Sequence, residues 1–292
     1  MLTIFIILTI VCGIISQKVK INYDIAKYLP SDSETRIGMD IMEDEFETTT
    51  SSLNIMFNDL PQDEKQEIYE YLKSVPNVKE VDYDDTEEYN IDNHTLYKIT
   101  VDAEADSDVA KQVYKEITTK YKEYSFDTNG DVSQYNKPVL HTWIIVLAVA
   151  CALVILIIMC DSYVEPFLFL FAILMAVVLN KGTNIMFKSI SNITESICAI
   201  LQMALSMDYS IMLMNRYVQE KKTEKDNVKA MKEALYHAFA SISSSSVTTI
   251  VGLLALVFMS FTIGKDLGFV LAKGVLFSLL TIFCVLPALI LM

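Results

Sequence analysis

The chain has 292 residues, of which 52% are hydrophobic, yet its formal net charge is −14. Apolar and acidic residues must therefore lie in separate parts of the chain. Residues 17–139 hold 28 acidic against 13 basic residues, and a surface of that charge repels nucleic acid. The sequence has no phosphate-binding loop, metalloprotease motif or nucleophile elbow, so we expect neither an enzyme nor an organic cofactor.

Residues 2–16 form an apolar run that is short for a membrane span, since roughly 20 residues are needed to cross the hydrocarbon. No basic residue precedes the run and no small-residue cleavage site follows it, as a secretory signal would require. We interpret residues 1–16 as a first transmembrane helix whose beginning is missing from this sequence.

Residues 17–138 alternate between strand and helix periodicity and predict a soluble α+β domain. This part has no cysteine, which excludes a disulfide framework, and the three histidines of the chain are scattered singly, so we expect no metal site. The pattern strand, helix, strand occurs twice, as in split ferredoxin-like domains. The predicted elements are the strands 51–57, 78–83, 96–101 and 124–128 and the helices 62–74 and 107–121.

Residues 139–292 contain five further apolar runs, which with the first helix predict a six-span, multi-pass α-helical membrane protein. A short turn at Cys160–Ser162 separates the first two of these runs. Residues 183–193 mix apolar and polar side chains and are expected to lie along the membrane surface. The five predicted spans are residues 140–159, 164–179, 194–215, 239–261 and 267–291.

A basic linker, residues 216–238, follows the fourth span and fixes the predicted topology, because basic loops face the cytoplasm. Both termini are then cytoplasmic, and residues 17–138 are extracytoplasmic. Val228, Met231 and Leu235 have helical spacing, which fits either a surface helix or a solvated charge run. The basic residues are Arg216, Lys221, Lys222, Lys225, Lys229 and Lys232.

Asp208 is an acidic residue near the centre of the fourth span. An ionisable group in hydrocarbon is costly, and such residues often relay protons. We therefore predict a proton relay of Asp208 with Tyr209. Gln202 and Ser206 share the polar stripe of this helix, and they serve either that relay or simple hydrogen bonds to neighbouring helices.

The fifth span begins with serines and carries a stripe of small residues. Such a stripe permits close helix packing, and it also supplies hydroxyl groups. Either role is open for Ser245 and Thr248; in the functional one they face Asp208. In the sixth span, Lys273 is near enough to the outer end to extend its ammonium towards water, and we prefer this to an ion pair with Asp208.

Three motifs resemble the MMPL family of the resistance-nodulation-division (RND) superfamily of proton-driven exporters. Ser206–Ile211, with Asn215–Tyr217 after it, is similar to the fourth transmembrane helix of the family. Tyr28–Ser33 and Asp266–Leu289 also match, and the resemblance covers the amino-terminal half of such a transporter. The chain departs from the family pattern at Ala204 and Ser206, where the family usually has glycines.

The resemblance implies a half-sized transporter module that uses the proton-motive force to export lipids or other hydrophobic molecules across the cytoplasmic membrane. Its exported domain would be of the ferredoxin-like porter type, and the coupling ion would be the proton. The expected partners are membrane lipids and a second transporter half, either as a homodimer or as a homologous chain. The alternatives are a sterol-sensing-like membrane sensor or scaffold, a translocation accessory, and a truncated transporter fragment.

Overall fold

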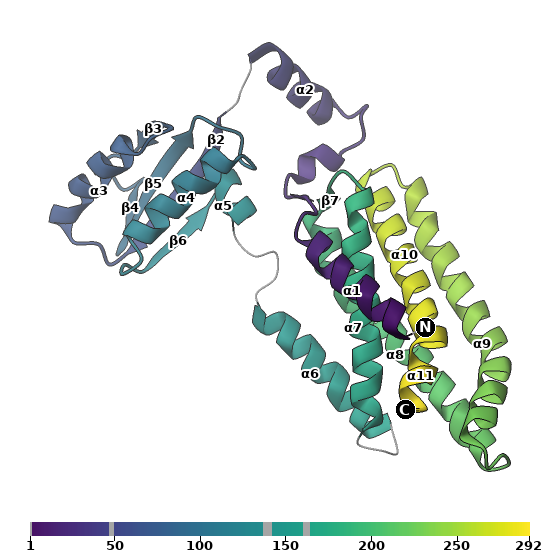
Figure 1. Cartoon of the computed structure of the whole chain (residues 1–292). Coiled ribbons are helices and arrows are strands. Elements are labelled where there is room, and N and C mark those ends of the chain that lie inside the picture. The colour runs from purple at the N-terminus through teal and green to yellow at the C-terminus, as the bar shows by residue number, and fades with distance from the viewer. Residues whose placement is uncertain (1, 47–49, 137–141, 160–163) are drawn as a thin grey trace. The chain divides into compact units, whose positions relative to one another are not determined.

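The computed structural model describes residues 2–46, 50–136, 142–159 and 164–292 (Figure 1). The chain divides into two compact units. One consists of residues 1–30 and 139–292, and the other of residues 31–138. The predicted turn at Cys160–Ser162 lies outside the described residues.

The unit of residues 31–138 is built on an antiparallel sheet with the strand order β3-β5-β2-β6 (Figure 1). The central pair is β2 with β5, joined over eight residues from Ser51↔Val101 to Asn58↔His94. The short β4 extends the sheet beside the start of β5. The strands are β2 (Ser51–Asn58), β3 (Val78–Asp82), β4 (Asn90–Ile91), β5 (His94–Val101) and β6 (Phe126–Asn129).

The alternating pattern of β2 places Leu53, Ile55 and Phe57 on one buried face of this sheet. Helices α3 (Gln62–Ser74) and α4 (Asp108–Lys120) pack on that face and complete one hydrophobic core. These strands and helices confirm the predicted strand–helix–strand order. Helices α2 (Glu34–Phe46) and α5 (Asp131–Asn136) were not predicted, because their short or mixed sequences give little periodicity.

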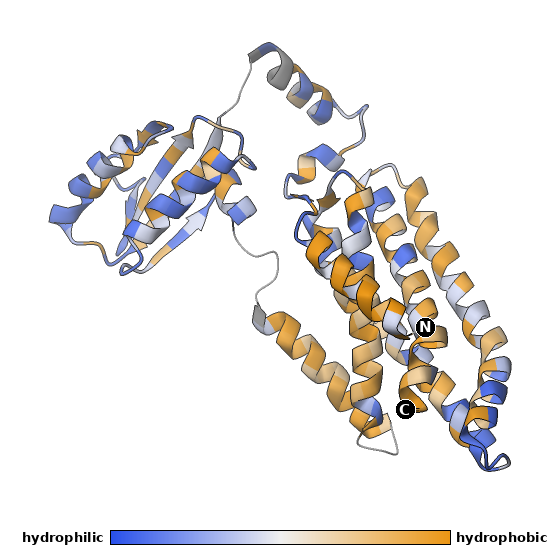
Figure 2. Cartoon of the chain, in the orientation of Figure 1, coloured by the Kyte–Doolittle hydropathy of each residue, from blue (hydrophilic) through white to orange (hydrophobic). Residues whose placement is uncertain are grey.

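The second unit is helical and its helices are apolar over most of their length (Figure 2). Within the described residues, four helical segments are long and apolar enough to cross a membrane, beginning at Glu165, Asn192, Asn227 and Ile263, while the apolar helices at residues 2–16 and 143–159 are shorter. The helices are α1 (Leu2–Ser16), α6 (Thr142–Met159), α7 (Glu165–Thr183), α8 (Asn192–Lys221), α9 (Asn227–Ala255), α10 (Ile263–Cys284) and α11 (Leu286–Ile290).

Local sequence signals account for the ends of these helices. The Ser191 hydroxyl accepts a hydrogen bond from the Thr194 N–H and caps α8. Asp226 caps α9 in the same way. The helix is interrupted between α10 and α11, next to Pro287, because proline cannot donate a backbone hydrogen bond. Because Asp226 starts a continuous α9, the predicted surface helix and fifth span are one element, and much of the predicted linker 216–238 is helical.

Residues 17–30 fold with the helices, which differs from the predicted boundary at residue 17. Strand β1 (Ile21–Asn22) pairs in parallel with β7 (Ile190–Ser191). The 3₁₀ turn η1 (Ile25–Tyr28) follows, and the Tyr28 carbonyl accepts hydrogen bonds from the Thr262 N–H and hydroxyl at 3.0 and 3.1 Å. We call residues 17–30 the strap. Residues 183–193, predicted to lie along the membrane surface, contain η2 (Asn184–Met186) and β7, and β7 is the strand that pairs with β1 of the strap.

Candidate functional site

Asp208 lies near the middle of α8, on a face of that helix that no other described element covers. Its side chain is exposed, and no hydrogen bond or ion pair joins it to another residue in the described part of the chain. The exposed residues of α8 recur every three or four positions, so they form one stripe along the helix. The α8 stripe consists of Ile197, Ile200, Ala204, Asp208, Met212, Asn215 and Gln219.

Tyr209 points elsewhere. It is buried, only 4% exposed, in the hydrophobic core of the helical unit. Consecutive residues on a helix are about 100° apart, which turns the ring of Tyr209 away from the α8 stripe. Within the described residues no hydrogen bond joins Tyr209 to Asp208. The structure therefore does not bring the two predicted relay residues together.

Ser206 and Gln202 lie on the inner side of α8 and bind α10. The Ser206 and Ser278 hydroxyl oxygens are 2.6 Å apart, and Ser206 also donates to the carbonyl of Gln202. The side-chain amide of Gln202 donates to the Gly274 carbonyl at 3.0 Å. All four residues are buried. Of the two roles left open for Gln202 and Ser206, the structure shows hydrogen bonding between helices.

Asn180 of α7 joins this polar network from the opposite side. Its Nδ2 donates to Gln202 Oε1 at 3.0 Å and to Cys198 Sγ at 3.1 Å. A Cβ atom on Gly274 would lie 2.6 Å from Asn180 Nδ2, so only glycine leaves room for this contact. Asn180, Gly274 and Ser278 were not singled out from the sequence. The available signal was the spacing of Gly274 and Ser278, which places two small residues on one face of α10.

The ammonium of Lys273 lies at the carboxyl end of α7, where within the described residues it is bonded to protein groups and not to Asp208. Its Nζ donates to the Asn180 carbonyl at 3.1 Å and to Asn184 Oδ1 at 2.6 Å. The carboxyl end of a helix carries partial negative charge, which stabilises a cation. Nearby, Lys181 and Glu195 form an ion pair between α7 and α8.

Ser245 and Thr248 are exposed on α9, and in the described residues neither bonds to Asp208. Thr248 instead donates to the carbonyl of Ser244 in its own helix. The exposed surface of α9 has two sides. One carries large apolar side chains, among them Phe239, Val247 and Val251. The other, the α9 stripe, carries only small residues: Ser241, Ser245, Thr248, Gly252 and Ala255.

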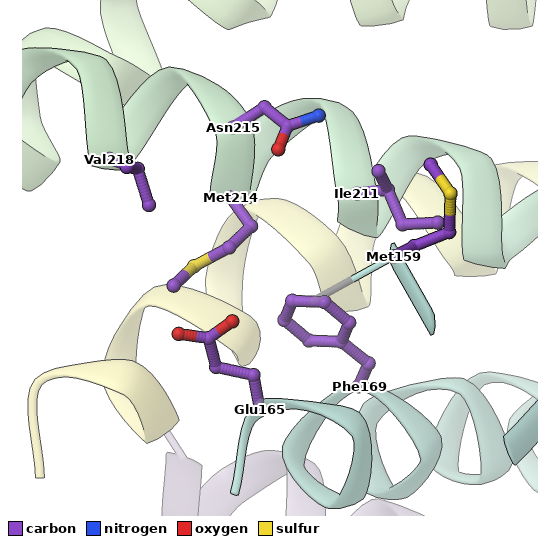
Figure 3. A pocket seen from close by; sticks show the side chains of 7 residues that line it. All are labelled: Met159, Glu165, Phe169, Ile211, Met214, Asn215 and Val218. Carbon is purple, nitrogen blue, oxygen red and sulfur yellow. The ribbon is translucent and has the colours of Figure 1, made fainter. Parts of the chain in front are cut away.

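A small pocket lies between α7, α8 and the end of α6 (Figure 3). Glu165 and Phe169 of α7 face Met214 and Asn215 of α8 across it. Its volume is about 10 Å³, close to the least that holds one water molecule. A hydrophobic substrate does not fit there. The described residues also hold no group of three or more metal-ligating side chains.

The described helices define a multi-helix membrane protein with a separate α+β unit. Comparison with known proteins identifies the family of this membrane protein. The sequence pattern of the MMPL family matches residues 27–292. The chain belongs to the MMPL family, within the RND superfamily, as its motifs predicted.

Two curated relatives cover shorter stretches. ActII-3 of Streptomyces coelicolor is 36% identical over 96 residues, which are 33% of this chain and 14% of that protein. MJ1562 of Methanocaldococcus jannaschii is 36% identical over 90 residues, which are 31% of this chain and 23% of the relative. The names of both describe membrane proteins.

The fold is similar to that of SecDF. A crystal structure of SecDF from Thermus thermophilus, a translocon-associated membrane protein, aligns with 99% of this chain at a TM-score of 0.55 and 12% identity. A second SecDF structure, in the super-membrane-facing form, gives a TM-score of 0.50. The chain covers 37% and 36% of those SecDF chains. At this identity the likeness concerns the fold alone.

Proposed function

We propose that the chain is a half-sized RND/MMPL-type transporter module that uses the proton-motive force to export lipids or other hydrophobic molecules across the cytoplasmic membrane. It acts without an enzymatic step or a cofactor other than the coupling proton. The observation that carries this proposal is the position of Asp208 in the middle of the exposed α8 stripe. A carboxylate at that depth is too costly to face lipid, so its environment must supply a polar path.

The polar path is formed with a second transporter half. The α8 stripe and the α9 stripe are both uncovered, and the α9 stripe has the small residues that allow close helix approach. Helices α8 and α9 pack side by side. One partner bundle can therefore cover both stripes. The partner is either a second copy of this chain or a homologous chain.

Within this arrangement Asp208 carries the proton, and it alternates between a neutral form and a charged form as the path opens to either side. Tyr209 is buried inside its own bundle. In this proposal Tyr209 therefore packs α8 in place and takes no direct part in the proton relay. Ser206 likewise belongs to the network between α8 and α10. Ser245 and Thr248 remain candidates to face the partner.

Residues 31–138 are proposed as the exported porter domain. Their strand order β3-β5-β2-β6, with two helices on one face, supports a ferredoxin-like domain. The basic residues between α8 and α9 support a cytoplasmic position for that loop. From there the topology assigns residues 17–138 to the extracytoplasmic side.

The test is Asp208→Asn, which keeps the shape of the side chain and removes its titration. In proteoliposomes with an imposed proton gradient, the wild-type protein should move a fluorescent phospholipid between leaflets, and the variant should lose this movement. Asn215→Ala is the matched control, because Asn215 lies on the same α8 stripe and does not titrate. A protonated carboxyl in the membrane should also react with dicyclohexylcarbodiimide in the wild type and not in the variant.

Equal transport by the Asp208→Asn protein at matched abundance would refute proton coupling through this residue. That result would favour the membrane sensor or scaffold, which tolerates loss of the carboxylate.

A further inference from the structure

An open groove of about 530 Å³ lies at one end of the helical unit. Three segments that are far apart in the sequence form it: the strap, the loop between α7 and α8, and the start of α10. These are the ends of the helices opposite the basic loop between α8 and α9 (Figure 1). The groove therefore lies at the extracytoplasmic membrane surface of the proposed topology.

Each of the three segments contributes one lysine to the groove: Lys27, Lys188 and Lys265. All three side chains are exposed, and in the described part of the chain none makes an ion pair or a side-chain hydrogen bond. Three cations around one groove repel one another. In a chain with a net charge of −14, this convergence favours a ligand that carries negative charge.

One carboxylate, that of Asp266, also lines this groove, and it already accepts hydrogen bonds from two groups of the protein. Asp266 accepts hydrogen bonds from the Ser191 N–H at 2.5 Å and from the Thr194 hydroxyl at 3.0 Å. It thereby fastens the start of α8 to the start of α10. These donors are neutral, so Asp266 keeps its charge, but three lysines against one carboxylate leave the groove with a net positive charge.

The other side chains of the groove include three large apolar ones, Met186, Phe187 and Phe269, beside the polar Asn22, Ser189 and Thr262. Met186 is 81% exposed and Phe269 is 46% exposed, and Phe187 also lines the groove. Exposed apolar side chains next to lysines suit a ligand with a charged group and hydrocarbon chains. A lipid headgroup meets this description, and the membrane surface is where its phosphate lies.

The groove is preformed rather than assembled from loose loops. The β1·β7 pairing and the two hydrogen bonds from Thr262 to the Tyr28 carbonyl hold the strap against the helices. A ligand therefore meets lysines whose backbones are already in place, which reduces the entropy lost on binding.

We propose that this groove binds the phosphate of an anionic phospholipid in the extracytoplasmic leaflet, with Lys27, Lys188 and Lys265 around the phosphate and Met186 and Phe269 against the acyl chains. The proposal does not involve Asp208 or the two stripes. It can therefore fail or succeed independently of proton-coupled export.

The test measures binding of dioctanoyl phosphatidylglycerol to the purified full chain in detergent. We expect a loss of about fivefold in affinity for each Lys→Gln substitution, and on the order of 100-fold for Lys27→Gln, Lys188→Gln and Lys265→Gln together. The matched control replaces three lysines at the other end of the bundle, Lys221, Lys222 and Lys225, with glutamine. This control should bind as the wild type does.

Two comparisons distinguish an anionic lipid from a neutral lipid and from free phosphate as the ligand of the groove. Dioctanoyl phosphatidylcholine should bind at least tenfold more weakly than phosphatidylglycerol, and inorganic phosphate should not compete at millimolar concentration. Equal binding of the two lipids, or competition by inorganic phosphate, would overturn the proposal. So would unchanged binding by the triple variant. If that variant fails to fold, a photoreactive phosphatidylglycerol is used on the wild-type protein instead. Its crosslinks should fall within residues 22–28, 186–189 or 262–269, and crosslinks confined to other residues would refute the proposal.

Discussion

Gly274→Ala should destabilise the helical unit, because α7, α8 and α10 meet at this residue. The added methyl group would lie 2.6 Å from Asn180 Nδ2 and 3.1 Å from Gln202 Oε1. Asn180 cannot simply turn away, since its Nδ2 also bonds to Cys198 Sγ and to the Val270 carbonyl. The substitution therefore either separates the helices or breaks these hydrogen bonds.

The magnitude follows from three contributions. Overpacking a closed core costs about 1–3 kcal/mol. Each lost hydrogen bond between membrane helices costs about 0.6 kcal/mol. The higher helix propensity of alanine returns up to about 1 kcal/mol. The net expected loss in the free energy of unfolding is about 1–3 kcal/mol.

The assay is unfolding of the detergent-solubilised protein with sodium dodecyl sulfate, followed by circular dichroism. Gly252→Ala is the matched control, because a Cβ atom there meets nothing within 4 Å; that variant should be as stable as the wild type or slightly more so. In the double variant Asn180→Ala, Gly274→Ala, the clash is absent, so the two changes should cost less together than the sum of the single changes. A Gly274→Ala protein as stable as the Gly252→Ala protein would refute the close contact.

Two further predictions concern topology and assembly. A cysteine at Asp85 should react with a membrane-impermeant thiol reagent in intact cells, while one at Lys225 should react only after lysis; reversed labelling would contradict the six-span topology. In a protein whose native cysteines are replaced, a cysteine at Thr248 should crosslink to a partner chain in the membrane. One at Val247, on the large apolar side of α9, should not, and equal crosslinking at both would exclude the α9 stripe as the interface.

The periodic segments were predictable from the sequence because their signal is local. The alternation in residues 51–57 indicates the strand that these same residues form. The Ser107 side chain caps the helix that begins at the next residue. The strands and helices of residues 51–129 therefore agree with the prediction within a few residues. The short β4 and α5 have too few residues for a period to show.

The contacts of the candidate site could not be predicted in the same way. A helical pattern shows that Gln202 and Ser206 share a side of α8, but the choice of α10 as their neighbour depends on how distant segments pack. Asp208 stands only two positions from Ser206, yet one lies on the uncovered face and the other in the core. The family motif places Asp208 and Tyr209 together as residues in sequence, while the helix separates their side chains.

The strap also has a mechanical consequence. The unit of residues 31–138 begins three residues after Tyr28, whose carbonyl accepts hydrogen bonds from Thr262, just before the first turn of α10. The same helix carries Gly274 and Ser278 in the network with α8. A tilt or shift of α10 would therefore displace the strap, because the Thr262–Tyr28 hydrogen bonds and the β1·β7 pairing join the strap to the ends of these helices. The last residues of the helical unit before residue 31 would thus move together with α10.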